Sequence, residues 1–184
     1  MPSDDIEPRS RRLRRLCRFV RGAVLLAAVV LLAWPLVLAA RPELLAEIGR
    51  QSAGLQEHPL TLDARGQALA IAAMLPPTAL GLLLCSLLWR LFGAYQRGQA
   101  LSAGAQRRLQ QVGATLLALA LVQPLSDAAL SVALTIGNPP GQRLLTLGFD
   151  SGDYLLVVVA VTILAVATAM HEAVRAAEEN RGFV

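Results

Sequence analysis

Three polar side chains at four-residue intervals are the clearest candidates for chemistry in this chain. Gln123, Asp127 and Ser131 occur inside the otherwise apolar stretch 114–136. Residues four apart lie on one face of an α-helix, so the three side chains would form one polar stripe. Because a carboxylate inside a membrane segment is costly and almost always faces other helices or a water-filled path, the stripe predicts an intramembrane polar site.

Two interpretations of Asp127 remain open at the level of the sequence. An intramembrane carboxylate can carry a proton or a cation along a transport path. It can also serve as a hydrogen-bonding staple between helices. No Lys or Arg occurs deep in any apolar stretch, and one acid without a second charged group in another span makes a poor relay. The pattern therefore favours the staple and keeps transport as the alternative.

The second candidate site is a basic turn between two apolar stretches. Tyr95, Arg97 and Gly98 precede Ser102 in a segment that contains several Arg residues and no Asp or Glu. Ser102 is expected to cap a short amphipathic helix that leads into the next apolar stretch. We expect this turn either to bind a protein partner or to act only as a turn and a helix cap.

The remaining reactive side chains do not form a recognisable catalytic or metal site. Cys17 and Cys85 lack the CxxC spacing of disulfide-forming enzymes. His58 and His171 are isolated, and Glu172 beside His171 would point away from it on a helix. The phosphate-binding, zinc-protease and serine-hydrolase motifs are also missing. We therefore expect a protein that is not an enzyme and that needs no cofactor or metal.

The elements that must position these residues are membrane helices. The chain is 55% hydrophobic and 4% aromatic, and its charges lie in short patches between long uncharged stretches. The predicted spans are 22–40, 68–92, 114–136 and 154–170. Each is close to the roughly 20 residues that cross the hydrocarbon core, where only a helix satisfies the backbone. The predicted fold class is an all-α integral membrane protein with one membrane domain, residues 1–184.

The Arg residues predict the orientation of the four spans, because cytoplasmic loops retain positive charge. Residues 1–21 and the connection between the second and third spans are rich in Arg, whereas the other two connections mix Arg with acids. We predict that both chain ends are cytoplasmic, with residues 1–21 as a basic arm and residues 171–184 as a tail. The arm is expected to contact anionic lipid rather than nucleic acid.

Two features of the spans have further consequences. Pro35, Pro76, Pro77 and Pro124 lie inside predicted spans and predict bends in three of them. The first span also has the basic front and the small residues of a signal peptide, but Arg-Pro directly after it would be a poor start for a mature chain, so we expect an uncleaved helix.

The basic turn and the tail resemble the bacterial membrane family catalogued as domain of unknown function 2975. In that family a span ends in a Tyr-x-basic-Gly turn, followed by a hydrophobic residue and Ser or Thr. The matching positions here are Tyr95, Arg97, Gly98, Leu101 and Ser102. Leu101 stands where we would expect Phe. The tail is similar to the family's ending, in which a Glu pair precedes a terminal hydrophobic residue, here Glu178, Glu179 and Val184.

The resemblance implies a four-span protein of the bacterial inner membrane and no established activity. Some members of the family are encoded beside small helix-turn-helix regulators, which suggests a cytoplasmic regulator as a partner. The predicted function is therefore that of a membrane partner of such a regulator, without direct nucleic-acid binding. The alternative is a small transporter or channel component that uses Asp127. Small residues on the last two spans permit a homo-oligomer.

Overall fold

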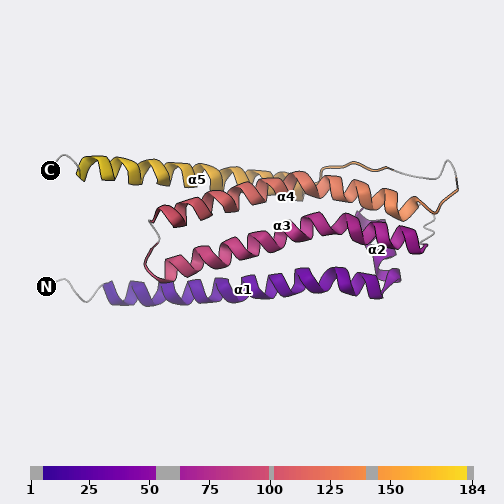
Figure 1. Ribbon diagram of the computed structural model, residues 1–184, viewed down its shortest axis with the longest axis horizontal. Helices are drawn as coiled ribbons and strands as arrows, with labels where there is room; N and C mark the ends of the chain where they lie inside the picture. Colours follow the sequence, from indigo (N-terminus) through magenta and orange to yellow (C-terminus); the bar gives the residue numbers. More distant parts are fainter. Residues whose placement is uncertain (1–5, 53–62, 100–101, 140–144, 182–184) are drawn as a thin grey trace.

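The computed structural model describes residues 6–52, 63–99, 102–139 and 145–181, and within these ranges it contains helices and no strand. The helices are α1 (Ile6–Ala40), α2 (Pro42–Ser52), α3 (Ala64–Gln96), α4 (Ala103–Thr135) and α5 (Ser151–Arg181). Four of them, α1, α3, α4 and α5, are long and apolar enough to cross a membrane (Figure 1). The prediction of an all-α chain with four apolar spans is confirmed.

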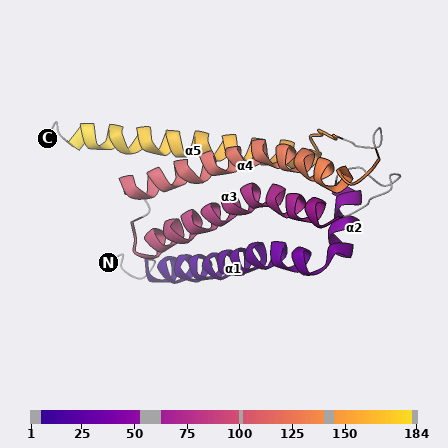
Figure 2. The ribbon, with the colours of Figure 1, turned by 45° about the vertical axis from the view of Figure 1, so that its right-hand side comes forward.

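The four long helices pack side by side in chain order. α1 packs on α3, α3 on α4, and α4 on α5, so that α1 and α5 form the two edges of the row (Figures 1 and 2). α4 has a long neighbour on each side, and 39% of its apolar segment is buried, against 11% for α1 and for α5. The exposed sides are apolar, with Leu26, Leu125 and Leu155 each more than half exposed. Surfaces of this kind suit contact with lipid.

The two ends of the row differ in chemistry. The start of α1, the turn between α3 and α4, and the end of α5 lie together (Figure 1). We call this the basic end, because Arg15, Arg18, Arg97 and Arg107 are exposed there. The opposite end carries α2, and we call it the α2 end. Exposed acids occur at the α2 end, including Glu43 and Asp63.

Helix α2 is the element that the sequence did not lead us to expect. It begins with Pro42, which suits the first helical position because its missing N–H would be unpaired there anyway. Leu45 is fully buried in a cluster that includes Leu38 of α1, Ala70 of α3 and Leu134 of α4. The helix therefore closes the α2 end of the row by packing against α1 and α4.

All four long helices extend beyond the predicted spans, and α3 does so by one turn at each end. α1 begins at Ile6, so most of the predicted basic arm is helical and continuous with the first span. α5 continues to Arg181, so the predicted tail is largely helical as well. Residues 103–113, expected as a short leading amphipathic helix, are the first turns of α4. No Pro interrupts the helix between these turns and the third span, so the two run as one element.

Proline does not interrupt the spans that contain it. Pro35, Pro76, Pro77 and Pro124 all lie inside continuous helices. Both views show that α3, which holds two of these prolines, changes direction along its length (Figures 1 and 2). A proline in a helix interior removes one backbone hydrogen bond and pushes the preceding turn aside, which accounts for curvature without a break.

One glycine sets the spacing of α4 and α5. A Cβ atom built on Gly113 would lie 2.7 Å from Cγ of Leu164, closer than real Cβ atoms approach their neighbours. Small residues at helix crossings in membranes let two backbones approach closely, and van der Waals contact then holds the pair. The close approach of α5 to α4 at this level therefore depends on the missing side chain.

Candidate functional site

The predicted polar stripe lies on α4, but its three members have different surroundings. Gln123 and Asp127 are half-buried, and a side-chain hydrogen bond joins them. Asp127 also lies near enough to Asp150 and Asp153, at the start of α5, for their charges to act on it. The carboxylate is therefore nearer the α2 end of the row than a position in the middle of a span.

Ser131 is fully buried and acts as a clamp for the chain that follows α4. Its hydroxyl donates to the carbonyl of Ala128 at 2.8 Å. The same oxygen accepts the backbone N–H of Thr146 at 3.1 Å. Thr146 belongs to the connection between α4 and α5, so Ser131 holds this connection against α4. The stripe thus contains a linked pair, Gln123 and Asp127, and a separate structural contact.

The two acids near Asp127 are already used by the backbone at the start of α5. Oδ1 of Asp150 accepts the N–H of Asp153 at 2.8 Å, and Oδ2 of Asp153 accepts the N–H of Asp150 at 3.2 Å. This reciprocal arrangement is a capping box, which satisfies two N–H groups that a helix start leaves unpaired. Within the part of the chain that the structure describes, no group of three His, Cys, Asp or Glu residues could hold a metal ion.

The basic turn ends α3 in a defined geometry. Gly98 has a φ of +76°, in the left-handed region that glycine adopts most easily. The N–H of Gly98 donates to the carbonyl of Tyr95, and the N–H of Gln99 donates to that of Ala94, both at 3.1 Å. These two bonds form a Schellman motif. The predicted turn is confirmed, and its glycine is required by the backbone.

Ser102 starts the next helix as expected. Its side chain accepts the N–H of Ala105 at 3.2 Å and donates to the carbonyl of Gln99 at 2.9 Å. Arg97, Gly98, Gln99 and Ser102 are exposed. Tyr95, by contrast, is half-buried and packs against the cluster between α3 and α4 that contains Leu91. The turn therefore presents Arg97 and Gln99 to the surroundings and uses Tyr95 for packing.

Cross-helix contacts that the sequence did not reveal join the neighbouring spans at the basic end. Nη1 of Arg21 donates to Oε1 of Gln96 at 3.0 Å, which ties α1 to α3. The Arg21 guanidinium carbon also lies 3.8 Å from the centroid of the Trp89 ring, a cation–π arrangement. Nδ1 of His171 lies 3.2 Å from Oε1 of Gln106, which ties α5 to α4. Arg and Trp near a span end were the available signal for the first contact.

Several residues of the sequence argument lie beyond what the structure describes. His58, Leu101 and Val184 fall outside the described residues. Glu178 and Glu179 lie within α5. The acidic tail and the hydrophobic position of the family pattern therefore stay as sequence observations.

The row of four apolar helices, joined by polar contacts at its basic end, defines a multi-pass membrane protein. The chain belongs to the family described as "Protein of unknown function (DUF2975)", whose model matches residues 20–181. The match covers the four spans and the basic turn, so the resemblance seen in the sequence is confirmed. No curated protein and no solved structure gives a match.

Proposed function

We propose that this chain is a protein of the bacterial inner membrane that binds a cytoplasmic protein through its basic end. The orientation rests on the positive-inside rule, because Arg outnumbers Asp and Glu at the basic end, although Glu172 is exposed there, whereas acids outnumber Arg at the α2 end. In this orientation the turn between α3 and α4 faces the cytoplasm. The proposed partner is a regulator with an acidic patch, and a helix-turn-helix protein is the candidate that the family resemblance suggests.

The observation that carries this proposal is an exposed basic surface on a rigid support. Arg97, Gln99 and Arg107 are exposed, and the adjacent backbone is held by the Schellman motif and by the Ser102 cap. The Arg21–Gln96 contact holds the end of α3 against α1. A surface that is already ordered loses little conformational entropy on binding, so a small contact area can still give useful affinity.

Site-specific photo-cross-linking tests the proposal. A photo-reactive amino acid replaces Gln99 in the full chain in its native host, and a matched version carries it at Ala64, which is exposed at the α2 end. We expect a cytoplasmic protein to cross-link from position 99 and not from position 64. The combined changes Arg97→Glu and Arg107→Glu should abolish this product, because opposite charge steers and orients partners.

The control for the charge-reversed protein is its accumulation in the membrane fraction. Equal accumulation with a lost cross-link supports a binding surface. A product of equal yield from positions 99 and 64, or one that survives both charge reversals, contradicts the proposal.

A second candidate function is transport, and one observation favours it. Gln123 lines an apolar groove of about 550 Å³ between α1, α3 and α4, and it is hydrogen-bonded to Asp127. A polar pair beside a groove within the spans is the arrangement a small solute or ion would use. Substitution of Asp127 separates this function from partner binding.

A further inference from the structure

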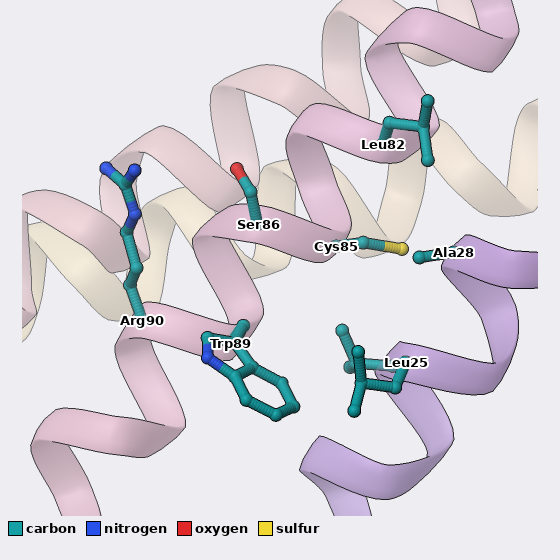
Figure 3. Close-up of a pocket in the computed structure, with 8 residues that line it drawn as sticks. Leu25, Ala28, Leu82, Cys85, Ser86, Trp89 and Arg90 are labelled. Atoms are coloured by element: carbon teal, nitrogen blue, oxygen red, sulfur yellow. The ribbon is translucent and has the colours of Figure 1, made fainter.

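A groove with a volume of about 310 Å³ lies between α1 and α3 and opens toward the basic end (Figure 3). Leu25 and Ala28 of α1 face Cys85 and Trp89 of α3 across it, while Arg90 points away from α1. Because α1 and α3 run in opposite directions, Ala28 lies at the deeper part of the groove. Trp89 and Arg90 lie at its mouth at the basic end. The groove is therefore apolar in depth and cationic at one mouth.

The cationic mouth has no carboxylate of its own. The stretch of α1 after Glu7 and the whole of α3 contain no Asp or Glu. Arg21, stacked on Trp89, donates through Nη1 to Gln96, and its Nε is buried without a hydrogen-bond partner in the described structure. Arg90 is exposed. A guanidinium presents five N–H donors and pairs best with a carboxylate or a phosphate, so these two side chains have donors to offer.

We propose that this groove is a binding site for one anionic phospholipid. An acyl chain lies between α1 and α3 along Leu25, Ala28 and Cys85, and the phosphate binds at the mouth beside Arg21 and Trp89. The exposed Arg90 side chain, which points away from α1 in the free protein, turns toward the bound phosphate. Charge complementarity selects an anionic lipid, since each Arg near the membrane surface favours one about fivefold. Tryptophan with its N–H at the headgroup level is also typical of this position in membrane proteins.

The larger groove beside Gln123 provides a contrast within the same molecule. Its lining comes from α1, α3 and α4 and contains no Arg. It can accept an apolar chain but offers no cation for a phosphate. Of these two grooves, the α1–α3 groove is the one that offers both an apolar surface for an acyl chain and a cation for a phosphate. The proposed orientation decides only which leaflet supplies the lipid, because the site itself rests on Arg21, Trp89 and Arg90.

Tryptophan fluorescence tests the site directly, because the chain has two Trp residues, Trp34 and Trp89. Trp34→Phe leaves Trp89 as the reporter in the full chain. The protein is placed in phosphatidylcholine vesicles with brominated phosphatidylglycerol or, at equal mole fraction, brominated phosphatidylethanolamine. We expect the anionic quencher to bind roughly 25-fold more tightly than the zwitterionic one, with about fivefold from each of Arg21 and Arg90. Both lipids are present in both leaflets, so the result does not depend on orientation.

Matched variants identify the residues that bind the phosphate. Arg90→Gln and Arg21→Gln should each lower the preference toward equal quenching. Arg65→Gln, which removes an exposed Arg at the opposite end of α3, should leave it unchanged. Trp89→Phe, with Trp34 as the reporter, should show no preference. Comparing two lipids on the same protein corrects for any change in Trp89 emission caused by loss of the Arg21 stack.

The acyl-chain part has its own pair of variants. Ala28→Leu fills the α1–α3 groove and should weaken quenching of Trp89 by the anionic lipid, whereas Ala27→Leu, which projects into the larger groove, should not. Circular dichroism checks that the variants have equal helix content. If Arg21→Gln fails to insert into the membrane, Arg90→Gln alone tests the binding of the phosphate.

Equal quenching by the two lipids in the Trp34→Phe protein overturns the proposal. A preference that survives Arg90→Gln and Arg21→Gln overturns it as well. The cross-link from position 99 tests partner binding separately, so its outcome does not depend on whether the lipid binds.

Discussion

Asp127 and Ser131 lie one helical turn apart on α4, and their roles are set by what surrounds each of them. Ser131 is fully buried and holds the N–H of Thr146, so its role is to keep the α4–α5 connection in place. Asp127 is half-buried and hydrogen-bonded to Gln123. Helical spacing predicted that the two side chains share a face, but it could not predict that the Ser131 hydroxyl would accept the N–H of Thr146. Asp127 is the ionisable member of the stripe.

Asp127→Asn distinguishes a hydrogen-bonding staple from an ion-transport group. Asn keeps the size and the hydrogen-bonding capacity of the side chain but removes its ability to ionise. If Asp127 is a staple, membrane accumulation, the cross-link from position 99 and the phenotype of the intact gene should all be retained. These are measured together in the native host, with Asp127→Ala as the variant that also removes the hydrogen bond to Gln123.

Partner binding and transport predict opposite results for the Asp127→Asn variant. A protein that accumulates and keeps its partner, yet loses the phenotype, would make Asp127 a working ionisable group and would place transport ahead of partner binding. Loss of the phenotype in Asp127→Ala alone would support the staple.

At the scale of elements, α2 shows how tertiary packing creates a helix that the sequence argument missed. Its 11 residues are too few for a stable isolated helix in water. Leu44, Leu45 and Ile48 follow helical spacing, which is the signal for α2 in the sequence. The burial of Leu45 among Leu38, Ala70 and Leu134 supplies the stabilisation that the short helix lacks by itself.

Leu45→Ala should destabilise the α2 end far more than Leu44→Ala. Leu45 is fully buried, whereas Leu44 is 43% exposed on the same helix. Truncating a buried Leu to Ala removes apolar contacts and leaves a cavity, at a cost of about 2–5 kcal/mol. Thermal unfolding of the purified full chain in detergent measures the difference. Equal melting temperatures for the two variants would show that α2 does not pack on the spans in the purified protein.

At the scale of the whole molecule, the row places the Arg-rich parts of α1, α3 and α4 at one end although they are distant in the chain. Exposed apolar side chains cover the rest of the row, including Phe19, Leu36 and Val161. A surface of this kind is stable in lipid and would aggregate in water. The charge difference between the two ends then determines how the row is oriented in the membrane.

Cysteine labelling in whole cells tests the orientation. Cys17 and Cys85 are first replaced by Ala, and a single cysteine is introduced by Ala64→Cys or Gln99→Cys, both at exposed positions. If the basic end is cytoplasmic, a membrane-impermeant maleimide should label position 64 in intact cells and position 99 only after permeabilisation. The reverse pattern would place the basic end outside and would remove the basis for a cytoplasmic partner.

The amino-acid sequence alone determined that the chain lies in a lipid bilayer, how many times it can span that bilayer, and the chemistry of the basic turn. These depend on composition and on interactions within a few residues: apolar stretches must be helical in a bilayer, Gly98 supplies a positive φ, and Ser102 caps the next helix. The tertiary structure decided which groups meet. Arg21 and Gln96 are 75 residues apart in the chain, and His171 and Gln106 are 65 apart. The groove between α1 and α3 likewise exists only where the two helices cross, because helical periodicity within one span carries no information about its neighbour.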